Sequence, residues 1–219
     1  MLARWSGWGA VPAVFDPDRD DFAEARAELT QLLSPADMAA AARSTLNARY
    51  TDAELVRAVW AGLGELGFAG GSVLEPGCGS GNFIGFAPPG TWMVGVELDP
   101  TTAAIAQALY PHAQILAESF AETRAPEQSF DAAVGNVPFG KLALTDLRHN
   151  PAGHSIRNHF IVKALHLVRP GGMVAVVTSR YTMDSRNPAA RREMANLADL
   201  VGAVRLPTGA HQRARARRL

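Results

Sequence analysis

The clearest chemical signal in the chain is a glycine-rich loop, in which Gly77, Gly79 and Gly81 alternate with other residues directly after an apolar run. Glycine adopts positive φ angles and lets a ligand approach the backbone closely. A phosphate-binding loop of the Walker type needs Gly-Lys-Ser or Gly-Lys-Thr, which is absent here. Glu75 opens the loop, and a carboxylate there repels a pyrophosphate but attracts a cation. The loop therefore predicts a site for a nucleoside that carries a positive charge. A tight turn without a ligand is the alternative.

Two further acids follow the next two apolar runs. Glu97 stands at the end of the second run, where a carboxylate can accept both hydroxyls of a ribose. Glu118 follows the third run, where it can accept an exocyclic amine, and Phe120 can face the ring that carries this amine. Each acid alone suggests only a solvated surface. Their order after the glycine loop favours a nucleoside site.

A fourth run ends in Asn136-Val137-Pro138-Phe139. An aromatic amino group is a poor nucleophile because its lone pair is delocalised into the ring. The Asn136 side-chain oxygen and the Val137 carbonyl can each accept one of its N–H groups. Pro138 stiffens the turn, and Phe139 can stack on a base. An Asn-Pro turn with a core Phe is the structural alternative.

These residues need a framework that brings the ends of four apolar runs together. Short apolar runs alternate with helix-length segments, which predicts an α/β fold with a mainly parallel sheet flanked by helices. The loops at the carboxyl ends of the strands then build the site. Strands are expected at residues 72–74, 92–96, 114–116, 130–134, 173–178 and 200–206, and the clearest helices at 100–110, 155–168 and 187–199.

The first part of the chain predicts helices and turns. A helix is expected over residues 20–33, and a second begins at Pro35 with Ser34 as its N-cap. Thr51 and Glu54 form a capping box for a third helix. Its apolar face is expected to comprise Leu55, Val59, Leu63 and Leu66.

Composition limits the class of protein. The 219 residues are 47% hydrophobic and 19% charged, which fits one globular core. No membrane span or secretory signal is evident. A single cysteine, Cys78, leaves no internal disulfide, so a cytoplasmic setting is expected. The first 211 residues carry 17 basic and 21 acidic side chains, and the tail at 212–219 adds four arginines. We expect this tail to be disordered.

Other candidate groups give weaker evidence for a function. His149, His154 and His159 recur every five residues without a supporting cysteine or carboxylate pattern, so no metal site is predicted. Cys78 has no evident activating partner and is expected to pack in the loop rather than act as a nucleophile.

Taken together, the motifs resemble S-adenosylmethionine-dependent methyltransferases that act on amino groups, in particular the N6-adenine DNA methyltransferases. That family combines an acid-Pro-x-Cys-Gly-type loop, an acid after strand two, an acid with an aromatic after strand three, and Asn-Pro-Pro-aromatic after strand four. Val137 replaces the first proline of the last motif. The resemblance implies S-adenosylmethionine as cofactor. It also implies that the Tyr50-Thr51 segment contacts the methionine part of that cofactor.

A wider resemblance, over residues 4–211, is to the methylase region of large helicase–methylase proteins of phages, plasmids and defence islands. It includes residues 5–9, 44–51, 154–160, 178–181 and 205–209. In these relatives a further strand follows Leu-Pro-Thr-Gly and inserts beside strand five. The tail at 212–219 has no strand pattern, so we expect a Rossmann-like methyltransferase fold that lacks its last strand.

The sequence thus predicts an N-terminal helical extension at 1–50, a catalytic domain at 51–211 and a basic tail at 212–219. The predicted function is methylation of the exocyclic amine of adenine in DNA, in a restriction-modification setting, with DNA as partner and a helicase domain or polypeptide implied by the resemblance. Two alternatives stay open. One is methylation of an RNA base or a protein glutamine. The other is a catalytically silent fragment that binds only cofactor or DNA.

Overall fold

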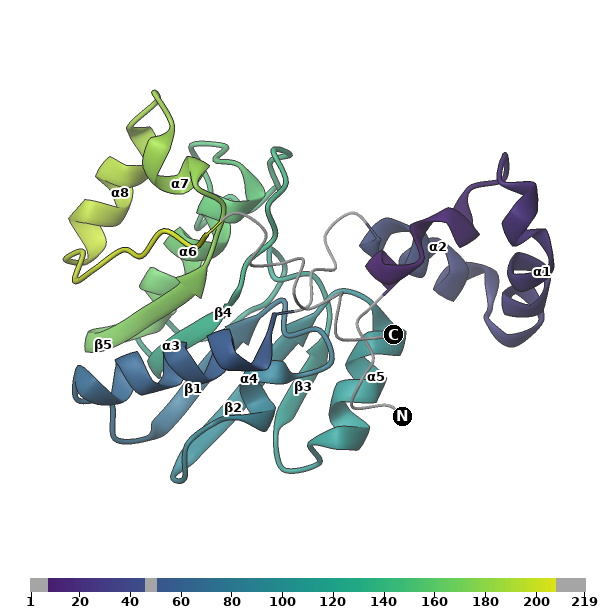
Figure 1. The fold of residues 1–219 in the computed structure, drawn as a ribbon. Helices are drawn as coiled ribbons and strands as arrows, with labels where there is room; N and C mark the ends of the chain where they lie inside the picture. Colours follow the sequence, from purple (N-terminus) through teal and green to yellow (C-terminus); the bar gives the residue numbers. More distant parts are fainter. Residues whose placement is uncertain (1–7, 46–50, 208–219) are drawn as a thin grey trace.

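A computed structural model describes residues 8–45 and 51–207. Its centre is a parallel sheet of five strands in the order β3-β2-β1-β4-β5 (Figure 1). The strands are β1 (Gly71–Pro76), β2 (Thr91–Glu97), β3 (Gln114–Ala117), β4 (Phe130–Asn136) and β5 (Val168–Val177). The parallel sheet predicted from the alternating pattern is confirmed, and all five strands point the same way.

Helices surround this sheet. They are α3 (Ala53–Glu65), α4 (Asn82–Gly85), α5 (Pro100–Leu109), α6 (Ile156–Leu167), α7 (Tyr181–Asp184) and α8 (Ala189–Leu197). Helices α1 (Ala23–Leu32) and α2 (Pro35–Ser44) lie to one side, where α2 contacts α5 (Figure 1). Within the described ranges, no helix is both long enough and apolar enough to cross a bilayer.

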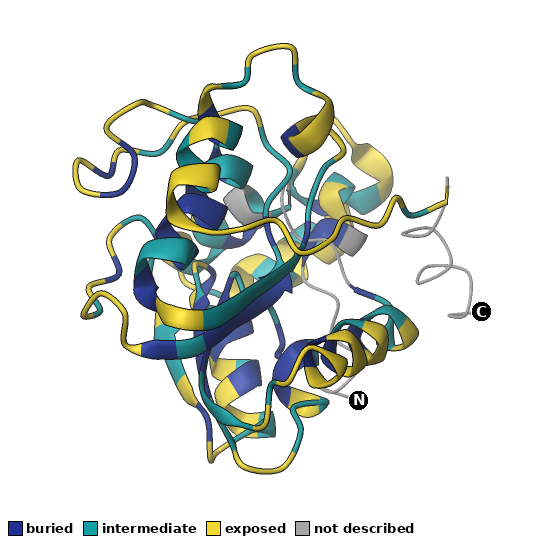
Figure 2. Cartoon of the chain, turned by 90° about the vertical axis from the view of Figure 1, so that its left-hand side faces the viewer, coloured by how far each residue is buried: buried dark blue, intermediate teal, exposed yellow. Residues whose placement is uncertain are grey.

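The core has two halves, one on each face of the sheet. Successive strand residues alternate between them, so Val73 faces one half and Leu74 the other. Helix α6 covers the half that contains Leu74, Phe160 and Leu167. Helices α3 and α4 cover the half that contains Val73, where Trp60 donates a hydrogen bond to the Phe83 carbonyl at 3.1 Å. Figure 2 shows the buried residues along the sheet and on the inner sides of these helices.

Local capping explains where the helices start and corrects one prediction. Ser34 caps α2 as expected, since its hydroxyl accepts from the Asp37 N–H at 3.2 Å. For α3 the N-cap is Asp52, not Thr51, and its carboxylate accepts from the Glu54 N–H at 2.9 Å. The buried face of α3 also differs from the prediction: it comprises Val56, Trp60 and Leu63, while Leu66 is 53% exposed.

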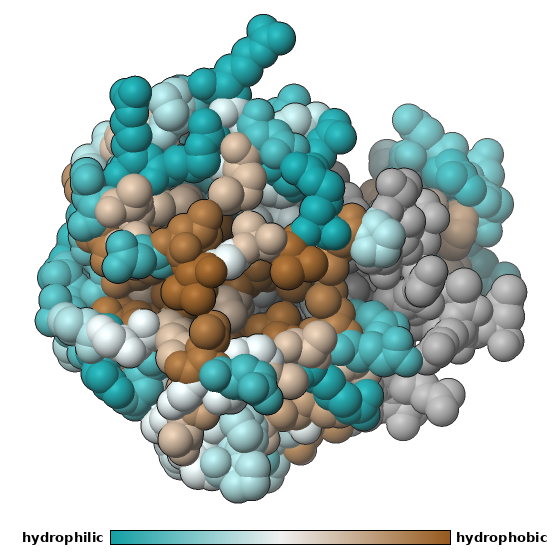
Figure 3. Space-filling model, turned by 60° about the vertical axis from the view of Figure 1, so that its left-hand side comes forward, coloured by the Kyte–Doolittle hydropathy of each residue, from teal (hydrophilic) through white to brown (hydrophobic). Residues whose placement is uncertain are grey.

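The predicted strand at 200–206 is wrong. Residues 198–207 follow α8 without regular structure, and Leu200, Val201 and Val204 are 70–88% exposed. Within the described part of the chain β5 is therefore an edge strand. The face on this side of the molecule is apolar across its middle and hydrophilic at its rim (Figure 3). The predicted tail at 212–219 lies outside the described residues.

Candidate active site at the carboxyl edge of the sheet

The predicted site residues share one edge of the sheet. Because the strands are parallel, β1 to β4 all end at this edge. Their last residues are Pro76, Glu97, Ala117 and Asn136. The strand order reverses direction between β1 and β4, and in open α/β sheets ligands bind at such a switch point. Glu75 belongs to one of these two strands and Asn136 to the other.

The glycine loop has the conformation expected of it. Gly77, Gly79 and Gly81 have φ angles of +72°, +56° and +87°. The Gly77 and Cys78 N–H groups donate to the Val96 carbonyl at 2.8 and 2.9 Å, which holds the loop against the end of β2. Among the described residues, no atom would lie within 4 Å of a Cβ added to Gly79. Within this part of the chain there is therefore room for a ligand beside Gly79.

Glu97 joins this loop to the second strand. Its carboxylate accepts from the Gly79 N–H at 3.0 Å and from the Asp99 N–H at 2.9 Å. Burial raises the pKa of Glu97, although these backbone hydrogen bonds favour its charged form. Each carboxylate oxygen has a second lone pair, so Glu97 can still accept a hydroxyl.

Glu75 is the most unusual acid of the site. Its side chain is 2% exposed, and its Oε2 atom has no hydrogen-bond partner within residues 8–45 and 51–207. Burial raises the pKa of Glu75 well above its usual value, despite hydrogen bonds from the backbone of Ile84 and Phe83. Gly135 of β4 lies beside this side chain, and a Cβ added there would be in ordinary van der Waals contact with the Glu75 Cγ at 3.5 Å. A buried carboxylate with an unmet oxygen is suited to a cationic partner.

Of the remaining residues predicted to bind the cofactor, the structure describes Thr51 and Glu118. Thr51 is buried, and its carbonyl accepts from the Asn82 side chain at 2.8 Å, which brings it to the end of the glycine loop. Tyr50 lies outside the described residues. Glu118 is half-buried and directly follows Ala117, the register partner of Glu97 across the β2–β3 pair.

Phe120 differs from its prediction. Its ring is 3% exposed and packs against Phe160, with the ring centroids 4.8 Å apart. The ammonium of Lys163 lies 5.0 Å from the Phe120 centroid on the same ring. Phe120 is a core residue and has no free face for an adenine ring. The physical reason is that α6 covers this loop, so the ring is enclosed by the helix rather than by a ligand.

The Asn136 motif continues from the end of β4 into a loop. The Val137 N–H donates to the Val177 carbonyl at 3.0 Å, and the Val137 side chain is 1% exposed in the core. Val137 can therefore serve the site only through its backbone, as predicted. Pro138 and Phe139 are half-buried. Arg157, at the start of α6, donates to the Phe139 and Gly140 carbonyls at 3.2 and 3.3 Å.

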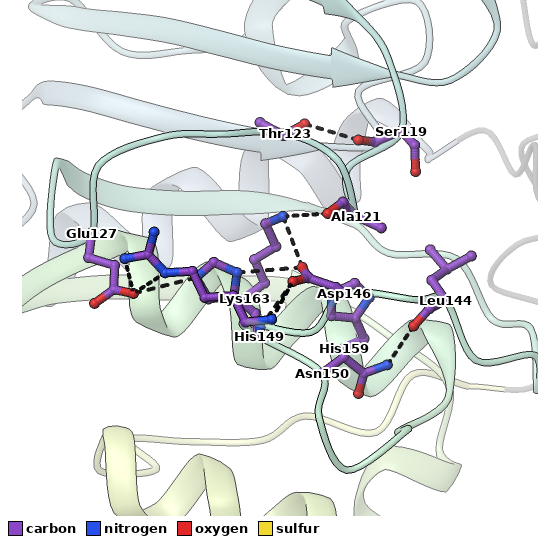
Figure 4. Close-up of polar contacts among 11 residues, drawn as sticks. Ser119, Ala121, Thr123, Glu127, Leu144, Asp146, His149, Asn150, His159 and Lys163 are labelled. Carbon is purple, nitrogen blue, oxygen red and sulfur yellow. Dashed lines mark hydrogen bonds and ion pairs between the residues drawn. The ribbon is translucent and has the colours of Figure 1, made fainter.

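A buried network, drawn in Figure 4, holds the next part of this loop. The Lys163 ammonium, 1% exposed, donates to Asp146 at 3.0 Å and to the Ala121 carbonyl at 3.1 Å. The His159 ring pairs with the same carboxylate at 3.0 Å. Burial alone would raise the pKa of Asp146, but hydrogen bonds from His149, His159 and Lys163 outweigh it and lower this pKa. The network ties the loop after β3 to the loop after β4.

Sequence reasoning missed Arg157, Asp146 and Lys163. Their contacts join segments 13 to 42 positions apart, and no short motif marks them. Of the three histidines singled out, His154 pairs with Glu193 at 2.7 Å, whereas His149 and His159 both lie near Asp146. Cys78 packs against Gly95, and burial raises the pKa of its thiol, which disfavours a thiolate nucleophile.

Sequence comparison finds two curated relatives. The chain is 31% identical over 165 residues to the "Defense against restriction protein B" of Escherichia phage P1, which covers 73% of this chain and 7% of that protein. It is 29% identical over 131 residues to the type II methyltransferase M.CvrRI of Paramecium bursaria Chlorella virus XZ-6E, covering 56% of this chain and 34% of that enzyme. The chain thus spans a minor part of both relatives. No protein-family model matches it.

Structural comparison agrees on the fold. A crystal structure from Vibrio vulnificus YJ016, described as a modification subunit of a type I restriction enzyme, superimposes with a TM-score of 0.56 at 19% identity. The match covers 78% of this chain and 42% of that one. With its parallel sheet flanked by helices, the chain has the predicted Rossmann-like methyltransferase fold.

Proposed function

We propose that this chain is an S-adenosylmethionine-dependent methyltransferase that acts on the exocyclic amine of adenine in DNA. The observation that carries the proposal is the placement of Glu75 and Asn136 near the carboxyl ends of the adjacent strands β1 and β4. A buried carboxylate with an unmet oxygen lies at the end of β1, and an amide that can hold an amine lies at the end of β4. A cationic methyl donor and an amino acceptor would then meet at the switch point of the sheet.

The described residues fit such a cofactor. S-adenosylmethionine supplies, when bound, a methyl group activated by a sulfonium cation. Glu75 would face this positive charge, and the open space beside Gly79 would admit the cofactor against the loop backbone. Glu97 would hold the ribose hydroxyls, and Glu118 the adenine amine. Thr51 and Tyr50 would border the methionine part.

Asn136 and Val137 would hold the acceptor amine. The Asn136 side-chain oxygen and the Val137 carbonyl each accept one N–H, which orients the nitrogen lone pair and stabilises the positive charge that develops on it. No general base is needed before the methyl group moves. A base in a duplex must leave the stack to reach Asn136, and stacking on Phe139 would return about 1–3 kcal/mol of that cost. Arg157 would hold the Phe139 and Gly140 carbonyls, which follow Pro138 in the loop.

The choice of DNA is supported by what this chain resembles. The Vibrio structure is described as part of a restriction enzyme, and the phage relative as a protein of defence against restriction. Restriction enzymes cut DNA, so a DNA substrate fits both descriptions. A helicase domain or polypeptide as partner stays a prediction from the family resemblance.

The direct test is transfer of a labelled methyl group from S-adenosylmethionine by the purified 219-residue protein. Unmethylated DNA, RNA of the same sequence and a glutamine-containing protein would be offered in parallel, and DNA digests analysed for N6-methyladenine. We expect label in DNA adenine that is lost in Asn136→Ala. Label only in RNA or protein would replace the proposed substrate. No label in any of them, with cofactor binding retained, would favour a fragment that only binds its cofactor.

A further inference from the structure

The charge of the chain is strongly divided along its length. Residues 1–150 contain nine basic and eighteen acidic side chains, whereas residues 151–211 contain eight basic and three acidic ones. The second segment includes α6, β5, α7 and α8. A basic segment in an otherwise acidic chain favours contact with a polyanion.

A polar cavity of about 280 Å³ lies within this basic segment. The start of α6 and its preceding loop form one wall, and the start of α8 and its preceding loop form the other. Its polar lining includes His154, Ser155, Arg157, Asn158 and Asn187. Both helices begin at this cavity; Ser155, the N-cap of α6, makes no side-chain capping bond, whereas the Asn187 side chain accepts from the Ala189 N–H of α8 at 3.0 Å. The positive ends of the two helix dipoles therefore meet there.

Three polar atoms at this cavity have no hydrogen-bond partner in the part of the chain that the structure describes. They are the Ser155 hydroxyl, the Arg157 Nε and the Asn158 side-chain oxygen, all of them buried. The structure therefore holds unmet hydrogen-bonding groups around one space, and a buried polar group without a partner is costly. An anionic ligand that moves these side chains slightly could accept from the Ser155 hydroxyl and the Arg157 Nε–H, whereas the Asn158 oxygen is itself an acceptor.

Arg157 gives the cavity its charge. Among the described residues Arg157 makes no ion pair, whereas Arg148, Arg169 and Arg205 each pair with a carboxylate. Glu193 contacts the lining through His154, with which it is paired at 2.7 Å. Arg157 also donates to the Phe139 and Gly140 carbonyls, so the cavity adjoins the loop that would hold the target base.

From these observations we propose that the cavity between the starts of α6 and α8 binds a phosphate of the nucleic-acid strand that carries the target base. Arg157 would contact that phosphate with one edge of its guanidinium while its other edge holds the Phe139 loop. Binding of the strand would thereby fix the loop that positions the base. This inference rests on the proposed function, since it takes the substrate to be a nucleic acid.

The test uses Ala189→Asp, because Ala189 is exposed, lines the cavity and is the first residue of α8. An acid at the first helical position favours the helix, so folding should be preserved, but its charge would repel a phosphate. Ala36→Asp, which adds the same charge near the exposed start of α2, is the matched control. Arg157→Gln removes the cation, and Arg169→Gln removes a paired arginine at the opposite end of β5.

Binding of a labelled single-stranded DNA oligonucleotide to the full chain would be followed by fluorescence anisotropy across a salt series, without cofactor. We expect Ala189→Asp and Arg157→Gln to weaken binding and to reduce the slope of log K against log salt by about 1, with both controls close to wild type. Inorganic phosphate should compete only weakly, because a strand makes many such contacts. Unchanged affinity and slope in both cavity variants would overturn the inference.

This outcome is separable from the proposed function. Wild-type protein that methylates DNA while the cavity variants bind DNA normally contradicts the cavity alone. Wild-type protein that binds the oligonucleotide through the cavity but transfers no methyl group contradicts the methyltransferase proposal and leaves the phosphate contact standing.

Discussion

The Glu97 carboxylate accepts the Gly79 N–H at 3.0 Å, across 18 positions of the chain. The acid predicted to hold the ribose therefore also holds the loop predicted to cradle the cofactor. Its other oxygen accepts the Asp99 N–H, and Asp99 in turn caps α5 by accepting from the Thr102 N–H at 2.9 Å. One carboxylate thus sets the spacing between the glycine loop and the second strand.

Glu97→Gln should weaken cofactor binding by about tenfold or more. The amide can accept only one of the two backbone N–H groups, and hydrogen bonds to a charged group contribute about 1.5–3 kcal/mol, where about 1.4 kcal/mol is tenfold in Kd. Titration calorimetry with S-adenosylmethionine measures the change. Glu122→Gln, an exposed acid in the following loop, is the control. Equal Kd values for Glu97→Gln and Glu122→Gln would show that Glu97 contributes no more to cofactor binding than an exposed acid does.

Glu75 should link cofactor binding to pH. Its pKa lies well above 4.5 in the folded protein, so its contribution to stability is present below 4.5 and is lost as pH rises through the folded value. A cation bound beside it would favour the charged carboxylate, and binding would release a proton. Calorimetry in two buffers of different ionisation enthalpy should detect this proton.

Glu75→Gln is the companion variant. The neutral amide should remove the proton release and weaken cofactor binding, while the unliganded protein becomes less sensitive to rising pH in thermal unfolding. Proton release that persists in Glu75→Gln would mean that another group titrates on binding.

Gly81→Ala should destabilise the chain. A Cβ there would lie 2.7 Å from the Tyr110 ring, and the residue has a φ of +87°, which costs an L residue about 1–2 kcal/mol even without the clash. Gly64→Ala is the contrast, since this position in α3 has nothing within 4 Å and should gain up to about 1 kcal/mol from helix propensity. Chemical denaturation of both variants tests the pair, and similar free energies of unfolding would contradict the loop geometry.

Lys163→Met should cost about 3–5 kcal/mol of stability, because it leaves the buried Asp146 carboxylate without its ammonium partner. The chain has one other lysine, and the exposed Lys141 provides the matched control Lys141→Met. Urea unfolding should place the Lys141 variant within about 0.5 kcal/mol of wild type. A comparable loss of stability in both variants would show that the buried Lys163–Asp146 pair stabilises the fold no more than an exposed lysine does.

The strand-and-loop framework was readable from sequence because each strand ends in a local signal. The glycine loop after β1 and the Asn136 turn after β4 mark their own positions. Residues 200–206 are apolar enough for a strand, but hydrophobicity alone does not supply a pairing partner. Thr51 and Asp52 are both good N-cap residues, so the sequence alone does not decide at which of the two the helix begins. The roles of Arg157 and Lys163 could not be predicted from the sequence. Their partners are carbonyls and an acid in loops that come close to them only in the folded chain.

The most direct test of the account is a calorimetric titration of S-adenosylmethionine into three purified proteins: wild type, Gly79→Val and Asn136→Ala. The account predicts micromolar binding by wild type and by Asn136→Ala, because Asn136 holds the acceptor and not the cofactor. It predicts no binding by Gly79→Val, whose side chain fills the space beside the loop. Cofactor at about 100 times its Kd should then stabilise the wild type by about 2.7 kcal/mol. A folded wild-type protein that does not bind, or a Gly79→Val variant that binds equally well, would contradict it.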